Sequence, residues 1–186
     1  MQRTILGMLV LLLAGSVGLA IAIPKPADSI SPSQQPLVHV KMDNRRLGAL
    51  IAHIDAEFEG QPGNWRLMVQ GIPAYVITDE QADRMRILVA AADATELGPD
   101  TLYRILQANF ESALDARYAI AQDTVWSAFI HPLSTLDEDE FFSAVAQTYN
   151  AALTFGDTYS SGVFQFGGGD NRSDVFDEII EKGTNI

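Results

Sequence analysis

The stretch from Pro99 to Leu133 constrains the fold most, because it combines one amphipathic helix with two short strands. Apolar residues recur at steps of three and four along its first half, a spacing typical of a helix with one buried face. These residues are Leu102, Ile105, Leu106, Phe110, Ala113 and Leu114. Pro99 suits the first helical position, since its missing N–H would have no intrahelical partner there. We therefore expect a helix that lies with one face on a flat surface.

The second half of the stretch supplies part of that surface. Side chains alternate over Arg117–Ala121 and again over Val125–His131, which is the period of a β-strand. Gln122 and Asp123 make a two-residue turn between them, although the usual glycine is absent. Both faces of the second strand carry apolar groups, so we expect it to be central in a sheet. Pro132 ends it.

The flanking sequence adds further helices and strands. Asp43 is a candidate N-cap for a helix whose apolar stripe reaches Phe58. Short connections between the next three strand candidates favour an antiparallel meander. These strands are Asn64–Gln70, Ala74–Thr78 and Arg84–Ala91. Thr135 and Glu138 have the spacing of a capping box before a third long helix, which Gly156 ends.

The predicted order is therefore helix, three strands, helix, two strands, helix. Helices segregated against an antiparallel five-stranded sheet define an α+β domain, which we place at residues 43–166. Residues 167–186 are expected to be a flexible acidic tail, with the pattern of a short helix over Asp174–Lys182. Three helices on such a sheet leave surface for a partner, so we expect a homodimer.

The N-terminus has the pattern of an export signal over residues 1–22. Arg3 precedes a long apolar run, and residues 20–22 (Ala-Ile-Ala) fit the rule of small residues at a cleavage site. An uncleaved anchor is the alternative, since the uncharged run to Pro24 is long enough to span a bilayer core of about 30 Å. Either reading places the rest of the chain outside the cytoplasm, as a periplasmic or secreted protein. Residues 23–42 are expected to be a linker, and the absence of cysteine excludes disulfides.

Four segments carry a family resemblance. They are DRMRILV (83–89), LYRILQANFESALDARYAIAQD (102–123), VWSAFIHPL (125–133) and GDTYSSG (156–162). Together they resemble the YbjN family within the type III secretion chaperone-like superfamily, over about Arg45 to Phe166. The resemblance implies a chaperone-like fold and a small, acidic, non-enzymatic protein that dimerises and holds segments of a partner. Secretion chaperones work in the cytoplasm, so the export signal of this chain differs from that family. The resemblance therefore implies only the fold and the binding of partner segments, and not a role in secretion.

Charge and composition narrow the classes of function. The chain has 24 acidic and 12 basic residues, a net charge of −12. Such a surface repels phosphates, so we expect no nucleic acid partner, and contact with a membrane only through a retained N-terminal segment. His39, His53 and His131 lack the spacing of zinc ligands, and the acids at 137–140 lack that of a calcium loop. With no serine elbow and no thiol, we expect no enzyme, metal or cofactor.

Four arginines in the predicted strands are the candidate binding residues. They are Arg66, Arg84, Arg86 and Arg117. Strand alternation allows several of them to share the less apolar face of the sheet, where they would anchor a carboxylate or a peptide C-terminus. Trp65, Tyr118 and Trp126 are expected mainly in the core.

The alternative for these arginines is pairing within the chain, for instance of Arg117 with Asp115 or Glu111, and of Arg84 with Asp83. The leading hypothesis is an exported, non-enzymatic protein that binds another polypeptide in a chaperone-like manner. The second hypothesis is a sensory or regulatory module that binds a small anionic ligand in an arginine-lined groove. A hydrolase ranks third.

Overall fold

The structure is a computed structural model that describes residues 40–162 and 172–185. The chain divides into two units, residues 1–38 and 39–186, and all of the described residues belong to the second. The signal peptide expected at residues 1–22 and most of the linker expected at 23–42 therefore lie outside the described residues.

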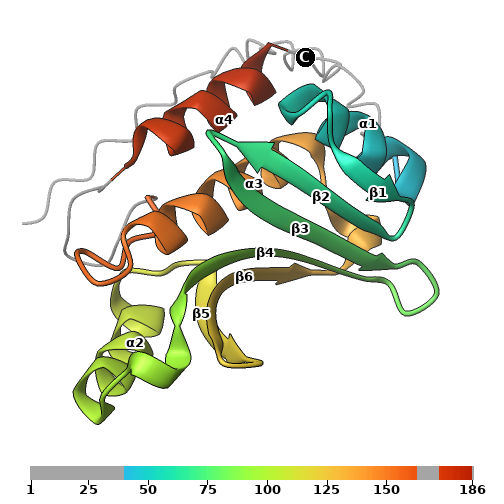
Figure 1. The fold of residues 1–186 in the computed structure, drawn as a ribbon. Coiled ribbons are helices and arrows are strands. Elements are labelled where there is room, and N and C mark those ends of the chain that lie inside the picture. Colours follow the sequence, from blue (N-terminus) through green and yellow to red (C-terminus); the bar gives the residue numbers. More distant parts are fainter. Residues whose placement is uncertain (1–39, 163–171, 186) are drawn as a thin grey trace, which may run out of the picture. The chain divides into compact units, whose positions relative to one another are not determined.

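The described residues form four α-helices and six β-strands, which confirms the α+β class (Figure 1). The α-helices are α1 (Asn44–Ile54), α2 (Pro99–Glu111), α3 (Glu138–Leu153) and α4 (Asp174–Thr184). The strands are β1 (Glu59–Gln61), β2 (Asn64–Val69), β3 (Ile72–Asp79), β4 (Arg84–Asp93), β5 (Arg117–Ala121) and β6 (Thr124–His131). Short 3-10 helices, η1 (Ala94–Glu96) and η2 (Leu133–Thr135), follow β4 and β6.

Three of the four described α-helices, α1, α3 and α4, begin at a residue whose side chain accepts a hydrogen bond from a free backbone N–H group, whereas α2 begins after Gly98 without a side-chain cap. Asp43 caps α1 as predicted, because its carboxylate accepts a hydrogen bond from Arg46 N at 2.8 Å. At α3 the predicted capping box of Thr135 and Glu138 is wrong. Thr135 lies in η2, and Asp137 is the N-cap, accepting from Glu140 N at 2.7 Å.

All six strands form one antiparallel sheet in the order β1-β2-β3-β4-β6-β5. The prediction of five strands missed β1, a short hairpin partner of β2 whose three residues are all exposed. With no buried side chain, β1 has no apolar alternation for sequence analysis to detect. The prediction of a central second strand is correct, because β6 lies between β4 and β5. Gln122 and Asp123 both have positive φ, as the predicted two-residue turn requires.

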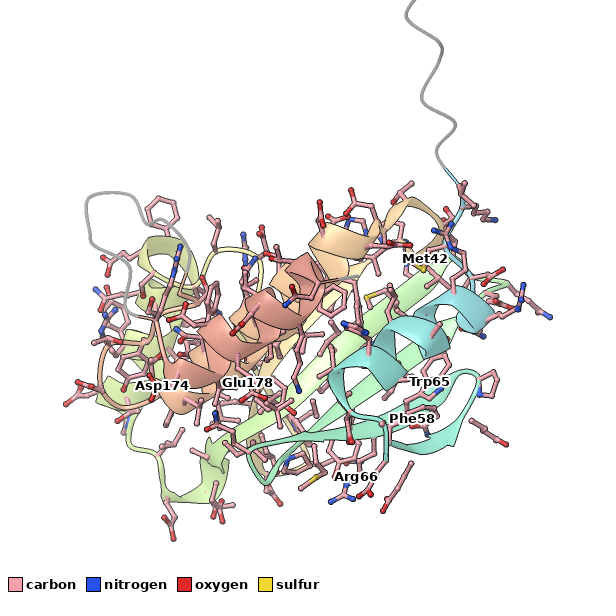
Figure 2. The ribbon with its side chains drawn as sticks, turned by 90° about the horizontal axis from the view of Figure 1, so that it is seen from above. Met42, Phe58, Trp65, Arg66, Asp174 and Glu178 are labelled. Carbon is pink, nitrogen blue, oxygen red and sulfur yellow. The ribbon has the colours of Figure 1, made fainter. Side chains whose placement is uncertain are left out.

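Helices α1, α3 and α4 lie on one face of this sheet, which we call the covered face (Figure 1). The strands contribute a continuous set of buried side chains to it. This set is Trp65, Leu67, Val69, Val76, Met85, Ile87, Val89, Val125 and Phe129. Helix α3 supplies Phe141, Val145 and Tyr149, all fully buried. Viewed from the helix side, Met42 and Trp65 lie close to α1 (Figure 2).

Helix α4 falls within the segment expected to be a flexible tail. Its apolar residues Val175, Phe176 and Ile179 are buried in the same core as α3. Ser173 caps its first turn, and the backbone N–H of Ser173 donates to Asn150 Oδ1 on α3 at 2.7 Å. Residues 174–184 are therefore a packed part of the domain, which extends beyond residue 166.

Helix α2 does not lie flat on the sheet, and this part of the prediction is wrong. It contacts β5 at the edge of the sheet and buries only Ile105 and Ala108 (Figure 1). Both belong to a second small core that includes Tyr118 and Tyr159. The larger apolar residues of the predicted stripe, Leu106 and Phe110, are 68% and 85% exposed.

Candidate functional site

The face of the sheet opposite α1, α3 and α4 carries the predicted binding residues, and we call it the open face (Figure 1). Strand alternation places every second residue of β2 to β6 on it, because its neighbours are buried on the covered face. The register aligns these side chains in rows across the strands. The first row is Glu59, Arg66, Tyr75, Leu88, Ala128 and Arg117, and the second is Gln61, Asn64, Ile77, Arg86 and Ile130.

The middle of the open face is apolar and aromatic. Tyr75 on β3 and Trp126 on β6 contact each other edge to face, with ring centroids 6.1 Å apart. Ile130 on β6 is 61% exposed, and Leu88 on β4 is half-buried. Trp126, which sequence analysis placed in the core, is also only half-buried, because β6 turns this side chain away from the helices. An antiparallel sheet often exposes one face, but usually a more polar one.

Arginines stand around this apolar centre. Arg66 and Arg117 occupy the same row on β2 and β5, four strand spacings apart, or about 19 Å. Arg86 lies in the next row, and Arg84 lies opposite Asp79 near the start of β4. The first two rows thus hold three arginines and one carboxylate, Glu59, in a chain whose net charge is −12.

The four arginines differ in how they are paired. Arg66 Nη1 lies 3.1 Å from Glu59 Oε2, and this hydrogen bond raises the pKa of Arg66. Arg117 Nε donates to the backbone oxygen of Leu114 at 3.0 Å. Within the described part of the chain, Arg84 and Arg86 form no ion pair.

The acids considered as partners for Arg84 and Arg117 have other contacts. Glu111 lies 3.2 Å from Arg104 on its own helix. Asp83 accepts hydrogen bonds from Ser134 N at 2.7 Å and from Ser134 Oγ at 2.8 Å, which lowers the pKa of Asp83. The third acid, Asp115, accepts a hydrogen bond from Gln147 Nε2. None of the three pairings considered above is an ion pair in the structure, although the charge of Arg84 contributes to the lowered pKa of Asp83 after the hydrogen bonds from Ser134.

A pocket of about 500 Å³ opens at one end of this region, beside the first residues of β5. It is lined by Asp115, Arg117, Tyr118, Ala119, Ala128, Phe129, Ile130, His131 and Glu140. Sequence analysis named Arg117 but missed Glu140, because Glu140 lies on α3 and meets β6 only in the folded chain.

His131 is engaged on both sides of its ring. Its Nε2 lies 3.1 Å from Glu140 Oε1, and its Nδ1 lies 2.8 Å from the backbone oxygen of Pro132. A general base needs a free nitrogen directed at its substrate, and this arrangement directs both nitrogens at protein oxygens. Tyr118 also lines the pocket, but its buried hydroxyl donates to Ala151 O at 2.6 Å, and burial raises the pKa of this hydroxyl well above the usual value.

The described residues show neither a metal-binding cluster nor a membrane-spanning helix. Residues 40–162 and 172–185 contain no group of three or more histidine, aspartate or glutamate side chains placed to hold a metal ion. In the same ranges, no helix has both the length and the apolar character needed to cross a membrane.

Comparison with known proteins does not assign the chain to a family. No family model matches the chain, and no match is found among curated proteins. Its function is therefore inferred from the surfaces described above.

Proposed function

We propose that this domain binds another polypeptide on its open face, without catalysing a reaction. The observation that carries the proposal is the row from Arg66 to Arg117, with Tyr75 and Leu88 between the two charges, on the face that the described helices α1, α3 and α4 leave open. Burying the apolar centre would favour association by about 25 cal/mol per Å² removed from water. The arginines would add charge-assisted hydrogen bonds to carboxylates of the partner.

The spacing of the arginines favours an extended partner over a small ligand. A small anion cannot reach both Arg66 and Arg117 across about 19 Å of sheet. An acidic polypeptide segment can contact both while covering the aromatic pair between them. The positive rows also attract such a segment locally, although the whole chain is acidic. This reading agrees with the resemblance to secretion chaperone-like proteins and with a place of action outside the cytoplasm.

Binding of a designed peptide tests the proposal. The probe is a labelled 16-residue peptide in which glutamates are spaced among valine, leucine and serine, and its control has lysine at each glutamate position. We expect the acidic peptide to bind and Arg86→Glu to weaken it about tenfold or more. Arg45→Glu makes the same charge change on α1, away from the open face, and should leave binding unchanged. Equal binding of the lysine peptide, or full affinity in Arg86→Glu, would refute the proposal.

We also propose that the expected homodimer forms through α2. Leu106 and Phe110 are strongly exposed, and Ile120 on the adjacent edge strand β5 is half-exposed to solvent as well. Arg104 and Glu111 on this helix pair with each other, and the helix's remaining charge, Asp100, lies in its first turn. Two copies of the helix can therefore approach without strong repulsion, and the same apolar patch serves both partners of a symmetric dimer.

Native mass distinguishes this dimer from a monomer. We expect the wild type to have twice the mass of one chain by light scattering, and Phe110→Glu to halve it, since Phe110 is 85% exposed and contributes little to the fold. Leu153→Glu, at a partly exposed position on α3, should stay dimeric. A monomeric wild type, or a dimeric Phe110→Glu variant, would exclude association through α2.

A further inference from the structure

Strand β5 is shorter than the strand it pairs with, and this leaves part of β6 without a neighbour. The first residue of β5, Arg117, pairs with Ala128. Beyond this point β6 continues from Phe129 to His131 and pairs with β4 on one side only. No other strand of the described residues lies on the second side, so the edge of β6 faces the pocket described above.

The chain before β5 is held away from this edge by α3. Asp115 N donates to Gln147 Oε1, and Gln147 Nε2 donates back to Asp115 Oδ2, both at 3.3 Å. Ala116, between Asp115 and β5, is fully buried. These contacts turn the chain toward the helix layer before it joins the sheet, and the pocket of about 500 Å³ occupies the space beside β6.

A strand that pairs antiparallel with β6 at this edge, as β5 does, would point its C-terminus toward β5. β5 is antiparallel to β6, so an added strand that is also antiparallel to β6 runs in the same direction as β5. Its C-terminal end then points at the first residue of β5, which is Arg117. The free edge spans three residues, about 10 Å, which suits the last few residues of a peptide.

Arg117 is suited to receive a carboxylate at that position. Its side chain is exposed, and the hydrogen bond that it forms within the described residues, to Leu114 O, uses Nε and neither of the two terminal nitrogens. An arginine presents two parallel N–H groups that match the two oxygens of a carboxylate. Unpaired backbone groups on a strand edge bind extended peptides, and nearby side chains give specificity.

We propose that this pocket captures the free C-terminus of an extended peptide, with the carboxylate on Arg117 and the backbone paired with the edge of β6. Asp115 and Glu140 place negative charge on the wall of the pocket, so a basic side chain a few residues before the C-terminus is favoured. The same acids disfavour a free inorganic anion. This inference rests on the proposed polypeptide binding and adds to it a second contact beside the open face.

A matched pair of short peptides tests the capture. The probe is fluorescein-labelled Ala-Val-Lys-Ala-Val with a free carboxylate, and its control is the same peptide with a C-terminal amide. We expect the free acid to bind about tenfold more tightly or better, as measured by fluorescence anisotropy. Arg117→Gln should reduce its affinity to that of the amide, and Arg117→Lys should restore part of it. Arg45→Gln should bind like the wild type.

Hydrogen exchange locates the bound peptide. Addition of the free acid should slow exchange of backbone amides within residues 129–131, because an added strand protects the edge of β6. Equal affinity of acid and amide, no effect of Arg117→Gln, or no binding at about 1 mM peptide would each overturn the capture. If these tests fail while the acidic 16-residue peptide still binds in an Arg86-dependent manner, the capture alone is wrong and the open-face proposal stands.

Discussion

On β4, Ile87 is completely buried on the covered face, whereas Leu88 next to it is half-buried on the open face. The same contrast runs along β6, where Phe129 is buried and Ile130 is 61% exposed. Both faces thus carry large apolar residues, but the described helices α1, α3 and α4 cover only one of them. The exposed apolar residues of the open face are not explained by the packing of the described residues, and this contrast supports the proposal that a partner binds there.

The largest effect is expected when the side chains of two adjacent residues, one on each face, are replaced by alanine. Ile87→Ala should lower the free energy of unfolding by about 2–5 kcal/mol, because it opens a cavity in a packed core. Leu88→Ala should lower it by about 1 kcal/mol or less, because its site is partly solvated. Urea denaturation measures both. Equal losses would mean that the open face is covered in solution.

The next test compares two glycines in helices of the covered face. A Cβ at Gly183 on α4 would lie 2.6 Å from Phe142 Cγ, so Gly183→Ala should destabilise by about 1–3 kcal/mol. A Cβ at Gly48 on α1 would lie 3.8 Å from Trp65 Nε1, an ordinary contact. Gly48→Ala should therefore stabilise by up to about 1 kcal/mol through helix propensity. A neutral Gly183→Ala would show that α4 is packed less tightly than described.

A smaller effect is expected at two buried serines. Ser127 Oγ on the covered face has no hydrogen-bond partner among the described residues, whereas Ser112 Oγ donates to Tyr159 O at 2.7 Å. Ser127→Ala should raise the unfolding free energy by up to about 1 kcal/mol, and Ser112→Ala should lower it by about 1–2 kcal/mol. Thermal unfolding measures both changes in stability. If both variants were stabilised, or both destabilised, the hydrogen bonding described for these two serines would be wrong.

The smallest effect is a pH dependence at the turn between β3 and β4. Hydrogen bonds from Ser134 lower the pKa of Asp83, so its carboxylate stabilises the folded state above the ordinary pKa of an aspartate. This stability is lost as the pH falls below about 4 and passes through the lowered pKa. The difference in stability between wild type and Asp83→Asn should therefore be constant near neutral pH and shrink in acid.

A control at the partner residue sharpens that measurement. Ser134→Ala removes one of the two donors to Asp83, so it should reduce the pH-dependent difference without abolishing it. Urea denaturation at a series of pH values follows both variants. A difference that stays constant from neutral pH to about pH 2 would show that Ser134 does not lower the pKa of Asp83.

Much of the fold could be predicted, because local signals specify it. Alternation identified β2, β4 and β6, and Asp43 and Pro99 marked the starts of α1 and α2. The apolar spacing correctly predicted that α2 is a helix, but it did not predict which residues α2 packs against. Apolar spacing shows that a helix has an apolar side without showing which neighbour, if any, covers it. The short strand β1 was missed because pairing, rather than burial, defines it.

The candidate site likewise has features that local sequence predicts and features that only the folded chain shows. The sequence alone determined that four arginines would lie in strands of an acidic α+β chain, because charge and side-chain alternation are local properties. Only the tertiary structure decided that Arg66, Arg86 and Arg117 share the open face, since that depends on strand order and on three of the described helices packing on the other side. It likewise decided that β5 begins too late to cover β6, because the contact between Asp115 and Gln147 joins residues far apart in the sequence.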